Sequence, residues 1–114
     1  MAIQPLVAPN LPTSPLPFSP AIQAGDFLFV SGQASVDATG KIVNDTFEGE
    51  VRRSLDNVRT ILTAAGLTFA DVVQTRQYVA RQEDLAQLNQ LYREYFVSPF
   101  PARTTLIGCL GTML

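Results

Sequence analysis

The sequence predicts an α+β fold in which two helices pack on one face of a single β-sheet. Segments 47–65 and 84–96 carry apolar residues at steps of three and four, the spacing of one helix face. Short runs of apolar and β-branched residues come before, between and after these segments, as expected of strands. Because an amphipathic helix must bury its apolar stripe, we expect both helices to cover the sheet.

The predicted strands differ in character. Phe27–Val30 is a continuous apolar run, which is typical of a strand covered on both faces. Small and polar residues at 31–33 interrupt it, and Gly32 indicates a bulge or a place where a ligand or another backbone comes close. The remaining strand segments are Ala34–Val36 and Lys41–Val43 around an Asp37–Gly40 hairpin turn, Asp71–Ala80, and Thr104–Ile107.

Capping signals set the expected helix ends. Asp45 with Glu48 predicts a capping box at the start of the first helix, and Asp84 with Gln87 predicts one at the start of the second. Gly66 is expected just beyond the C-terminus of the first helix, where a left-handed conformation is common.

The first 20 residues hold six of the eight prolines, so they cannot form a helix or a central strand. We interpret 1–20 as an extended surface arm anchored by Leu16 and Phe18, with a partly disordered tail as the alternative. The whole chain, 1–114, is expected to form one domain.

Composition narrows the function classes. The formal charge is −2 without a Lys/Arg run, which argues against a nucleic-acid partner. No apolar stretch reaches 18 residues and Met1–Pro20 lacks the features of a secretory signal, so we expect neither a membrane span nor export. The single cysteine, Cys109, cannot form an internal disulfide; it indicates a reducing compartment, the cytoplasm, and is expected to be a small buried residue near the sheet end.

The sequence contains no histidine, which removes histidine acid/base catalysis, Ser-His triads and most zinc sites. Arg103 is the most suggestive polar residue, because Pro99 and Pro101 make a stiff turn before the strand that it begins. Its guanidinium fork matches a carboxylate. On residue type alone, an ion pair with one of the chain's own acids is the favoured alternative.

Two asparagines accompany the helices. Asn57 lies beside the apolar stripe of the first helix, and we expect it to bond backbone at a buried edge. Asn89 flanks the apolar face of the second helix, where a structural bracket and a ligand contact are equally open.

Five motifs in order resemble the Rid (YjgF/YER057c-type) family of imine/enamine deaminases. The match runs from about Phe18 to Leu110 with nearly the family's spacing. The motifs are Phe29–Gln33, Leu55–Val58, Ala64–Leu67, Asn89–Tyr92 and Pro101–Thr105.

The resemblance implies a chorismate-mutase-like α+β domain assembled as a homotrimer, with the sheets forming an inner barrel and clefts between subunits. It implies that Arg103 clamps the carboxylate of a 2-imino acid and that the Thr105 backbone holds the other end of the substrate or the water. Ser31, with Gly32 beside it, and Asn89 would line the cleft. Water would attack the C=N carbon and ammonia would leave, without a metal or organic cofactor.

Two departures from the family pattern keep a second function open. Phe18 stands where active members carry a tyrosine, so a hydroxyl is missing although the ring can still wall the pocket. The sequence also ends at Leu114, before a last family strand whose glutamate helps to orient the water. The alternative is therefore a non-catalytic Rid-family protein that binds small carboxylates or has a regulatory role.

Overall fold

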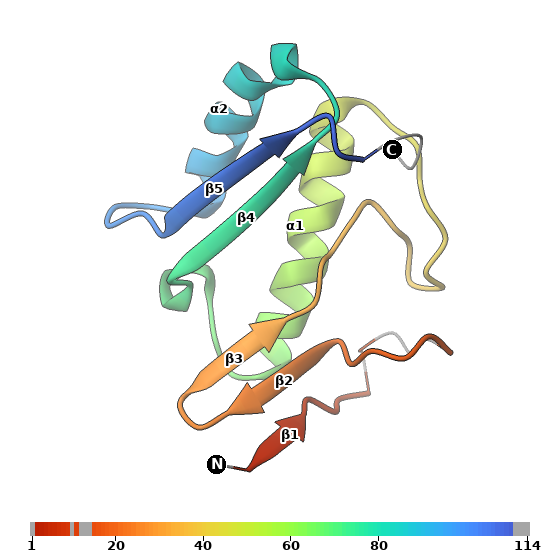
Figure 1. Ribbon diagram of the computed structural model, residues 1–114, viewed down its shortest axis with the longest axis vertical. Helices are drawn as coiled ribbons and strands as arrows, with labels where there is room; N and C mark the ends of the chain where they lie inside the picture. The colour runs from red at the N-terminus through yellow and green to blue at the C-terminus, as the bar shows by residue number, and fades with distance from the viewer. Residues whose placement is uncertain (1, 10, 12–14, 111–114) are drawn as a thin grey trace.

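The computed structural model describes residues 2–9, 11 and 15–110, and both helices cover the same face of its strands (Figure 1). The α+β prediction, with two helices on one face, is therefore confirmed. In chain order the helices and strands are β1 (Ile3–Pro5), β2 (Ala21–Ala24), β3 (Phe27–Val30), α1 (Phe47–Ala64), β4 (Gln74–Val79), α2 (Leu85–Tyr95) and β5 (Ala102–Ile107).

Within the described residues the strands form two separate sheets, not the single sheet that the sequence predicted. β1, β2 and β3 are antiparallel neighbours, whereas β4 and β5 pair in parallel, from Gln74 opposite Ala102 to Val79 opposite Ile107. Parallel neighbours need a crossover connection, and α2 provides it. The pairing places Thr75 directly beside Arg103.

The expected strands on either side of the Asp37–Gly40 turn are absent, and only Val36 and Ile42 form a bridge. Side-chain hydrogen bonds hold this segment where a strand pairing was expected. The Asn57 amide donates to the carbonyl oxygens of Ala34 (3.0 Å) and Val36 (3.2 Å). The backbone-bonding role predicted for Asn57 is confirmed.

The cap of α1 lies one residue later than predicted. Thr46, not Asp45, is the N-cap, and its hydroxyl accepts a backbone N–H three residues on at 3.1 Å. Glu50 accepts the Asp45 N–H at 3.1 Å, while the expected partner, Glu48, pairs with Arg52 at 3.0 Å. The ion pair one helical turn away draws Glu48 from the cap.

The cap predicted for α2 is wrong. A 3₁₀ turn, Gln82–Asp84, runs directly into α2, so Asp84 has helical backbone angles and makes no capping bond. Its carboxylate lies 3.5 Å from Arg81 instead. Gly66 follows α1 with φ +77°, as predicted.

Other segments also differ from expectation. The strand predicted from Asp71 starts only at Gln74, because a 3₁₀ turn capped by Thr68 and Asp71 precedes it. The arm is anchored by Leu11, which is buried with Ala21 and Ile61. Leu16 and Phe18, the expected anchors, are 62% and 55% exposed.

Near the C-terminus, Cys109 is exposed rather than buried. It follows Gly108, whose left-handed backbone turns the chain as β5 ends. Residues 111–114, where the sequence leads towards a further strand, lie outside the described residues. Neither helix within the described ranges is long and apolar enough to cross a bilayer.

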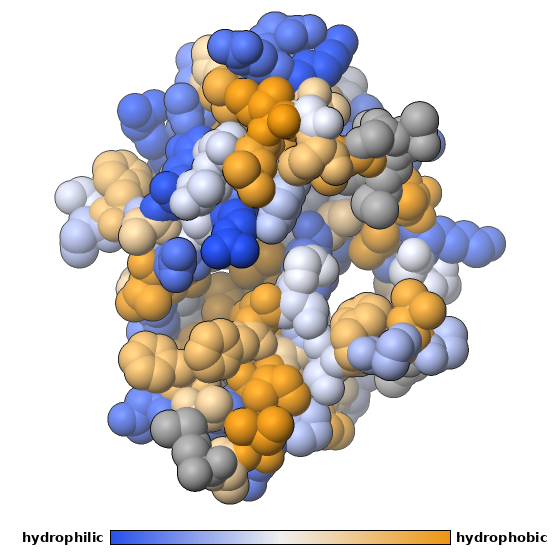
Figure 2. All heavy atoms as spheres, in the orientation of Figure 1, coloured by the Kyte–Doolittle hydropathy of each residue, from blue (hydrophilic) through white to orange (hydrophobic). Residues whose placement is uncertain are grey.

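The face away from the helices is open and exposes several large apolar side chains. Leu28 and Val30 of β3 pack on the core, so Phe27 and Phe29 point to the opposite side. Phe27, Phe29, Tyr78 and Leu106, called the open face below, are 61%, 63%, 49% and 42% exposed. Apolar side chains are visible over the β1–β3 part in Figure 2. Within one chain, β3 is thus covered on one face only.

Candidate functional site

Arg103 lies in a surface pocket between β5 and α2. Burial alternates along β5, and Arg103 and Thr105 are the half-buried positions, on the side of the helices. The pocket has a volume of about 240 Å³ and is lined by Asn89, Tyr92, Arg93, Phe100, Pro101 and Arg103.

Two contacts hold the Arg103 guanidinium. Nε donates to the Thr105 hydroxyl at 3.2 Å, and the guanidinium carbon lies 4.6 Å from the centre of the Tyr92 ring. Across the described part of the chain, no carboxylate lies within 4.0 Å of Arg103, and its two terminal nitrogens have no hydrogen-bond partner. The ion pair considered from the sequence is therefore not formed with any described acid, and the fork is free for a planar anion.

Tyr92 is a pocket residue whose ring is held by contacts with two other side chains. It is only 5% exposed, and its ring stacks on Phe96 with centroids 4.4 Å apart. Its hydroxyl lies 3.0 Å from that of Thr75 on β4. Because a buried phenol needs a partner, this bond fixes the ring at its far end.

Thr105 links Arg103 to the neighbouring strand. Its hydroxyl accepts from Arg103 and donates to the side-chain oxygen of Gln77 at 3.4 Å. With the donor used in this way, an Oγ1 lone pair faces Arg103, which agrees with the direction of the Nε bond.

Asn89 lies on α2 at the pocket wall. Its backbone carbonyl accepts from Arg93 at 3.5 Å, and its side-chain amide has no partner among the residues that the structure describes. Asn89 is exposed, so its amide is open to solvent, and both the ligand contact and the structural bracket stay predictions.

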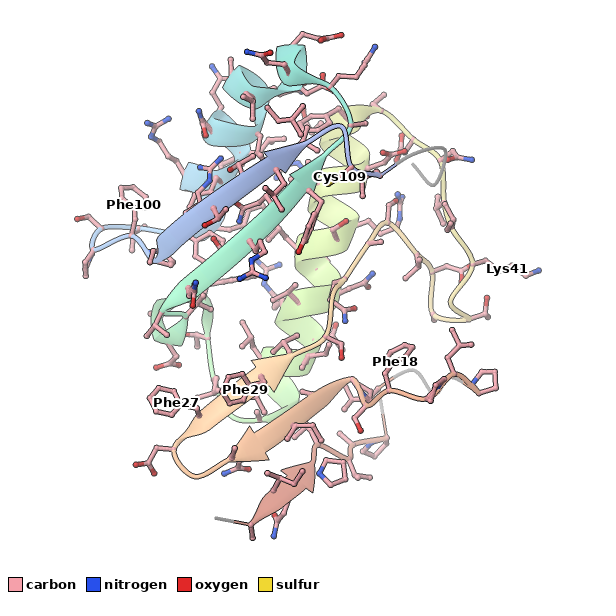
Figure 3. All side chains as sticks on the ribbon, viewed as in Figure 1. Phe18, Phe27, Phe29, Lys41, Phe100 and Cys109 are labelled. Atoms are coloured by element: carbon pink, nitrogen blue, oxygen red, sulfur yellow. The ribbon has the colours of Figure 1, made fainter. Side chains whose placement is uncertain are left out.

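Phe18, Ser31 and Gly32 lie elsewhere. The Ser31 hydroxyl donates to the carbonyl of Ser19 at 2.5 Å, which ties Ser31 to the segment carrying Phe18. None of the three lines the Arg103 pocket, and Figure 3 shows Phe18 on the opposite side of the molecule from Phe100. A single chain thus brings together Asn89, Arg103 and Thr105 only.

Sequence reasoning missed Tyr92 and Phe100 as pocket residues. By sequence, Tyr92 falls within the apolar periodicity of segment 84–96, and Phe100 stands between Pro99 and Pro101. The signal available was position, since Tyr92 stands three residues after Asn89 and therefore on the same side of α2.

The family model described as Endoribonuclease L-PSP matches residues 9–109. The chain belongs to this family. A RutC family protein from Pyrococcus horikoshii is 40% identical over 98 residues, which are 85% of this chain and 78% of the relative. The human 2-iminobutanoate/2-iminopropanoate deaminase is 36% identical over 88 residues, 76% of this chain and 64% of that protein.

A solved structure supports the same assignment. The Rid family protein YyfA from Yersinia pestis, described as of unknown function, superposes with a TM-score of 0.87 at 31% identity. The match covers 97% of this chain and 90% of YyfA. The Rid resemblance seen in the five motifs is therefore confirmed, and the L-PSP match includes Phe18 as well as the Arg103 pocket.

Proposed function

We propose that this L-PSP family protein hydrolyses 2-imino acids to 2-oxo acids and ammonia without a cofactor. The observation that carries the proposal is the Arg103 fork, which is held from one side and has both terminal nitrogens free within the described structure. A bidentate arginine is suited to a small carboxylate. The name of the human relative adds support, since it is a deaminase of this substrate class.

The chemistry asks for positioning more than for acid/base groups. Arg103 binds the carboxylate, and the Asn89 amide and the Thr105 backbone bracket the other end. Water adds to the C=N carbon, its protons pass to nitrogen, and the C–N bond breaks to release ammonia as the C=O bond forms. Fixing the reactants in a near-attack geometry lowers such a barrier by several kcal/mol.

The complete site is proposed to form between copies of the chain. Phe18, Ser31 and Gly32 do not reach Arg103 in one chain, so a neighbouring copy would supply them. The open face, with Phe27 and Phe29 more than half exposed, gives such an assembly an apolar surface to bury. We propose the homotrimer with an inner barrel that the family resemblance implies, located in the cytoplasm.

A non-catalytic carboxylate-binding protein is the second candidate, and Phe18 favours it. The hydroxyl that a tyrosine would offer to the substrate is absent. Cleavage of RNA, which the family description names, is less consistent with the residues. The chain has a net charge of −2 and no histidine for general acid/base catalysis.

Ammonia release tests the proposal. An amino-acid oxidase generates the imino acid in situ, and the protein is added as the wild type, Arg103→Ala or Arg81→Ala. Arg81 is a matched control because it is an exposed arginine outside the pocket. We expect acceleration by the wild type and Arg81→Ala only.

Binding of 2-oxobutanoate separates the two candidates. Binding that depends on Arg103 without any acceleration would establish the carboxylate-binding protein instead. Equal acceleration by Arg103→Ala would refute the clamp.

A further inference from the structure

We propose that Tyr92 is a positioning residue that sets the plane of the Arg103 guanidinium, so that Tyr92 determines selectivity for a carboxylate. The inference rests on the proposed function, because it concerns the group that would bind the acid. It adds a residue of α2 that touches no reacting atom and acts only through Arg103.

The need for such a residue follows from the shape of the clamp. Arginine has a long side chain with several rotatable bonds, and two parallel hydrogen bonds to a carboxylate form only in one plane. The Thr105 hydroxyl fixes Nε but leaves rotation about that contact free. The Tyr92 ring, 4.6 Å from the guanidinium carbon, supplies the second constraint through its electron-rich face.

Tyr92 can do this because it is itself held at both ends. Phe96, the residue directly after α2, stacks on the ring, and the Thr75 hydroxyl holds the phenol from β4. Thr75 is the strand partner of Arg103, so the hydroxyl bond ties the ring to the same pair of strands that carries the arginine.

A ligand-independent measurement tests the positioning. The Nε–H resonance of Arg103, assigned by its loss in Arg103→Lys, should be displaced by the ring current of Tyr92. We expect most of the displacement to remain in Tyr92→Phe, with only a small shift from loss of the hydroxyl bond to Thr75. In Tyr92→Leu it should vanish, with faster side-chain motion by ¹⁵N relaxation. An Arg103 resonance that is identical in the wild type and Tyr92→Leu would overturn the inference.

Binding shows the consequence for selectivity. Calorimetry with 2-oxobutanoate and with its uncharged methyl ester should show Tyr92→Leu losing about tenfold in preference for the acid. Tyr92→Phe should lose less than about threefold, since it keeps the ring. A general collapse of the pocket would weaken acid and ester alike, and that result would contradict a positioning role.

A pair of gentler variants covers the case in which Tyr92→Leu does not fold. Thr75→Val and Tyr92→Phe each remove one hydroxyl of the same bond, so the double variant should shift the Arg103 resonance no more than either single variant. Additive shifts, or no shift in any of the three, would refute the link through Thr75.

These readouts keep the two proposals apart. If 2-oxobutanoate does not bind to the wild type, the proposed function fails, while the resonance of Arg103 still decides whether Tyr92 positions it. If binding is strong but Tyr92→Leu leaves both the resonance and the preference unchanged, the clamp stands and the positioning role falls.

Discussion

The two halves of the proposed site differ in how much of their geometry a single chain fixes. Around Arg103, the Thr105 hydroxyl and the buried Tyr92 ring hold the guanidinium before any ligand arrives, and the Thr75 hydroxyl holds that ring. In the other half Phe18 is 55% exposed, and an added Cβ at Gly32 would meet nothing within 4 Å. The Arg103 half is therefore pre-organised by its own chain, whereas the Phe18 half is open to solvent within the described residues.

Breaking the pre-organised half should have the largest effect. Arg103→Lys keeps the charge but loses the planar fork, and Arg103→Ala loses both. Two charge-assisted hydrogen bonds correspond to roughly 10³-fold in kcat/KM for alanine, and we expect about 10²-fold for lysine. Steady-state ammonia release measures both. Full activity of the lysine variant would show that a point charge suffices.

Breaking the exposed half should act through assembly. Phe29→Glu places a charge on the open face, and we expect light scattering to report a monomer and the activity to fall to background. Ile42→Glu is the control, because Ile42 is 48% exposed but lies outside the strands. A Phe29→Glu protein that keeps the mass of the wild type would exclude this face from the interface.

The same contrast explains what the sequence could predict. Helix periodicity located α1 and α2 to within two residues, because burying an apolar stripe is a local requirement. The Pro101–Thr105 motif pointed to Arg103, since a single chain positions it. The pairing of the strands and the residue that anchors the N-terminal arm could not be predicted, because both depend on contacts between distant parts of the chain. Whether Leu11 or Leu16 is buried depends on which meets Ile61 in three dimensions.

The role of Tyr92 was hidden for a related reason. Periodicity assigns it to the apolar side of α2, and there it does lie, buried against Phe96. Only the register of β4 with β5 shows that its hydroxyl meets Thr75 and that its ring meets Arg103. Sequence pattern gives the face of a helix but not the neighbour across it.

A tyrosine at position 18 tests whether the exposed half of the proposed site contacts the substrate. Phe18→Tyr should raise kcat/KM by about three- to tenfold, the value of one added hydrogen bond to substrate, without changing the melting temperature. Ammonia release on the assembled protein measures the gain. Unchanged kinetics would place residue 18 away from the substrate in the assembly.

Ser31→Ala should have a smaller effect, on stability before activity. The Ser31 hydroxyl is committed to the Ser19 carbonyl, so its loss should lower the free energy of unfolding by about 1 kcal/mol. We expect less than about a threefold change in kcat/KM, measured beside urea unfolding. A large kinetic loss at unchanged stability would instead assign Ser31 a direct contact with substrate.

The smallest expected effect is on stability at acidic pH, and it should leave the Arg103 half of the site unchanged. The Thr39 hydroxyl, followed by the backbone N–H groups of Lys41 and Thr39, lowers the pKa of Asp37 below its usual range.

Because the pKa of Asp37 is lower in the folded than in the unfolded protein, its carboxylate stabilises the fold at pH values above the ordinary pKa. This stability is lost as the pH falls through the folded pKa. Urea midpoints of the wild type and Asp37→Asn should therefore differ near neutral pH and converge as the pH falls below the ordinary pKa of an aspartate. Binding of 2-oxobutanoate at pH 7 should be the same in both proteins, because the Asp37–Gly40 turn has no contact with the pocket. Parallel midpoints across the whole range would show that this carboxylate does not hold the turn.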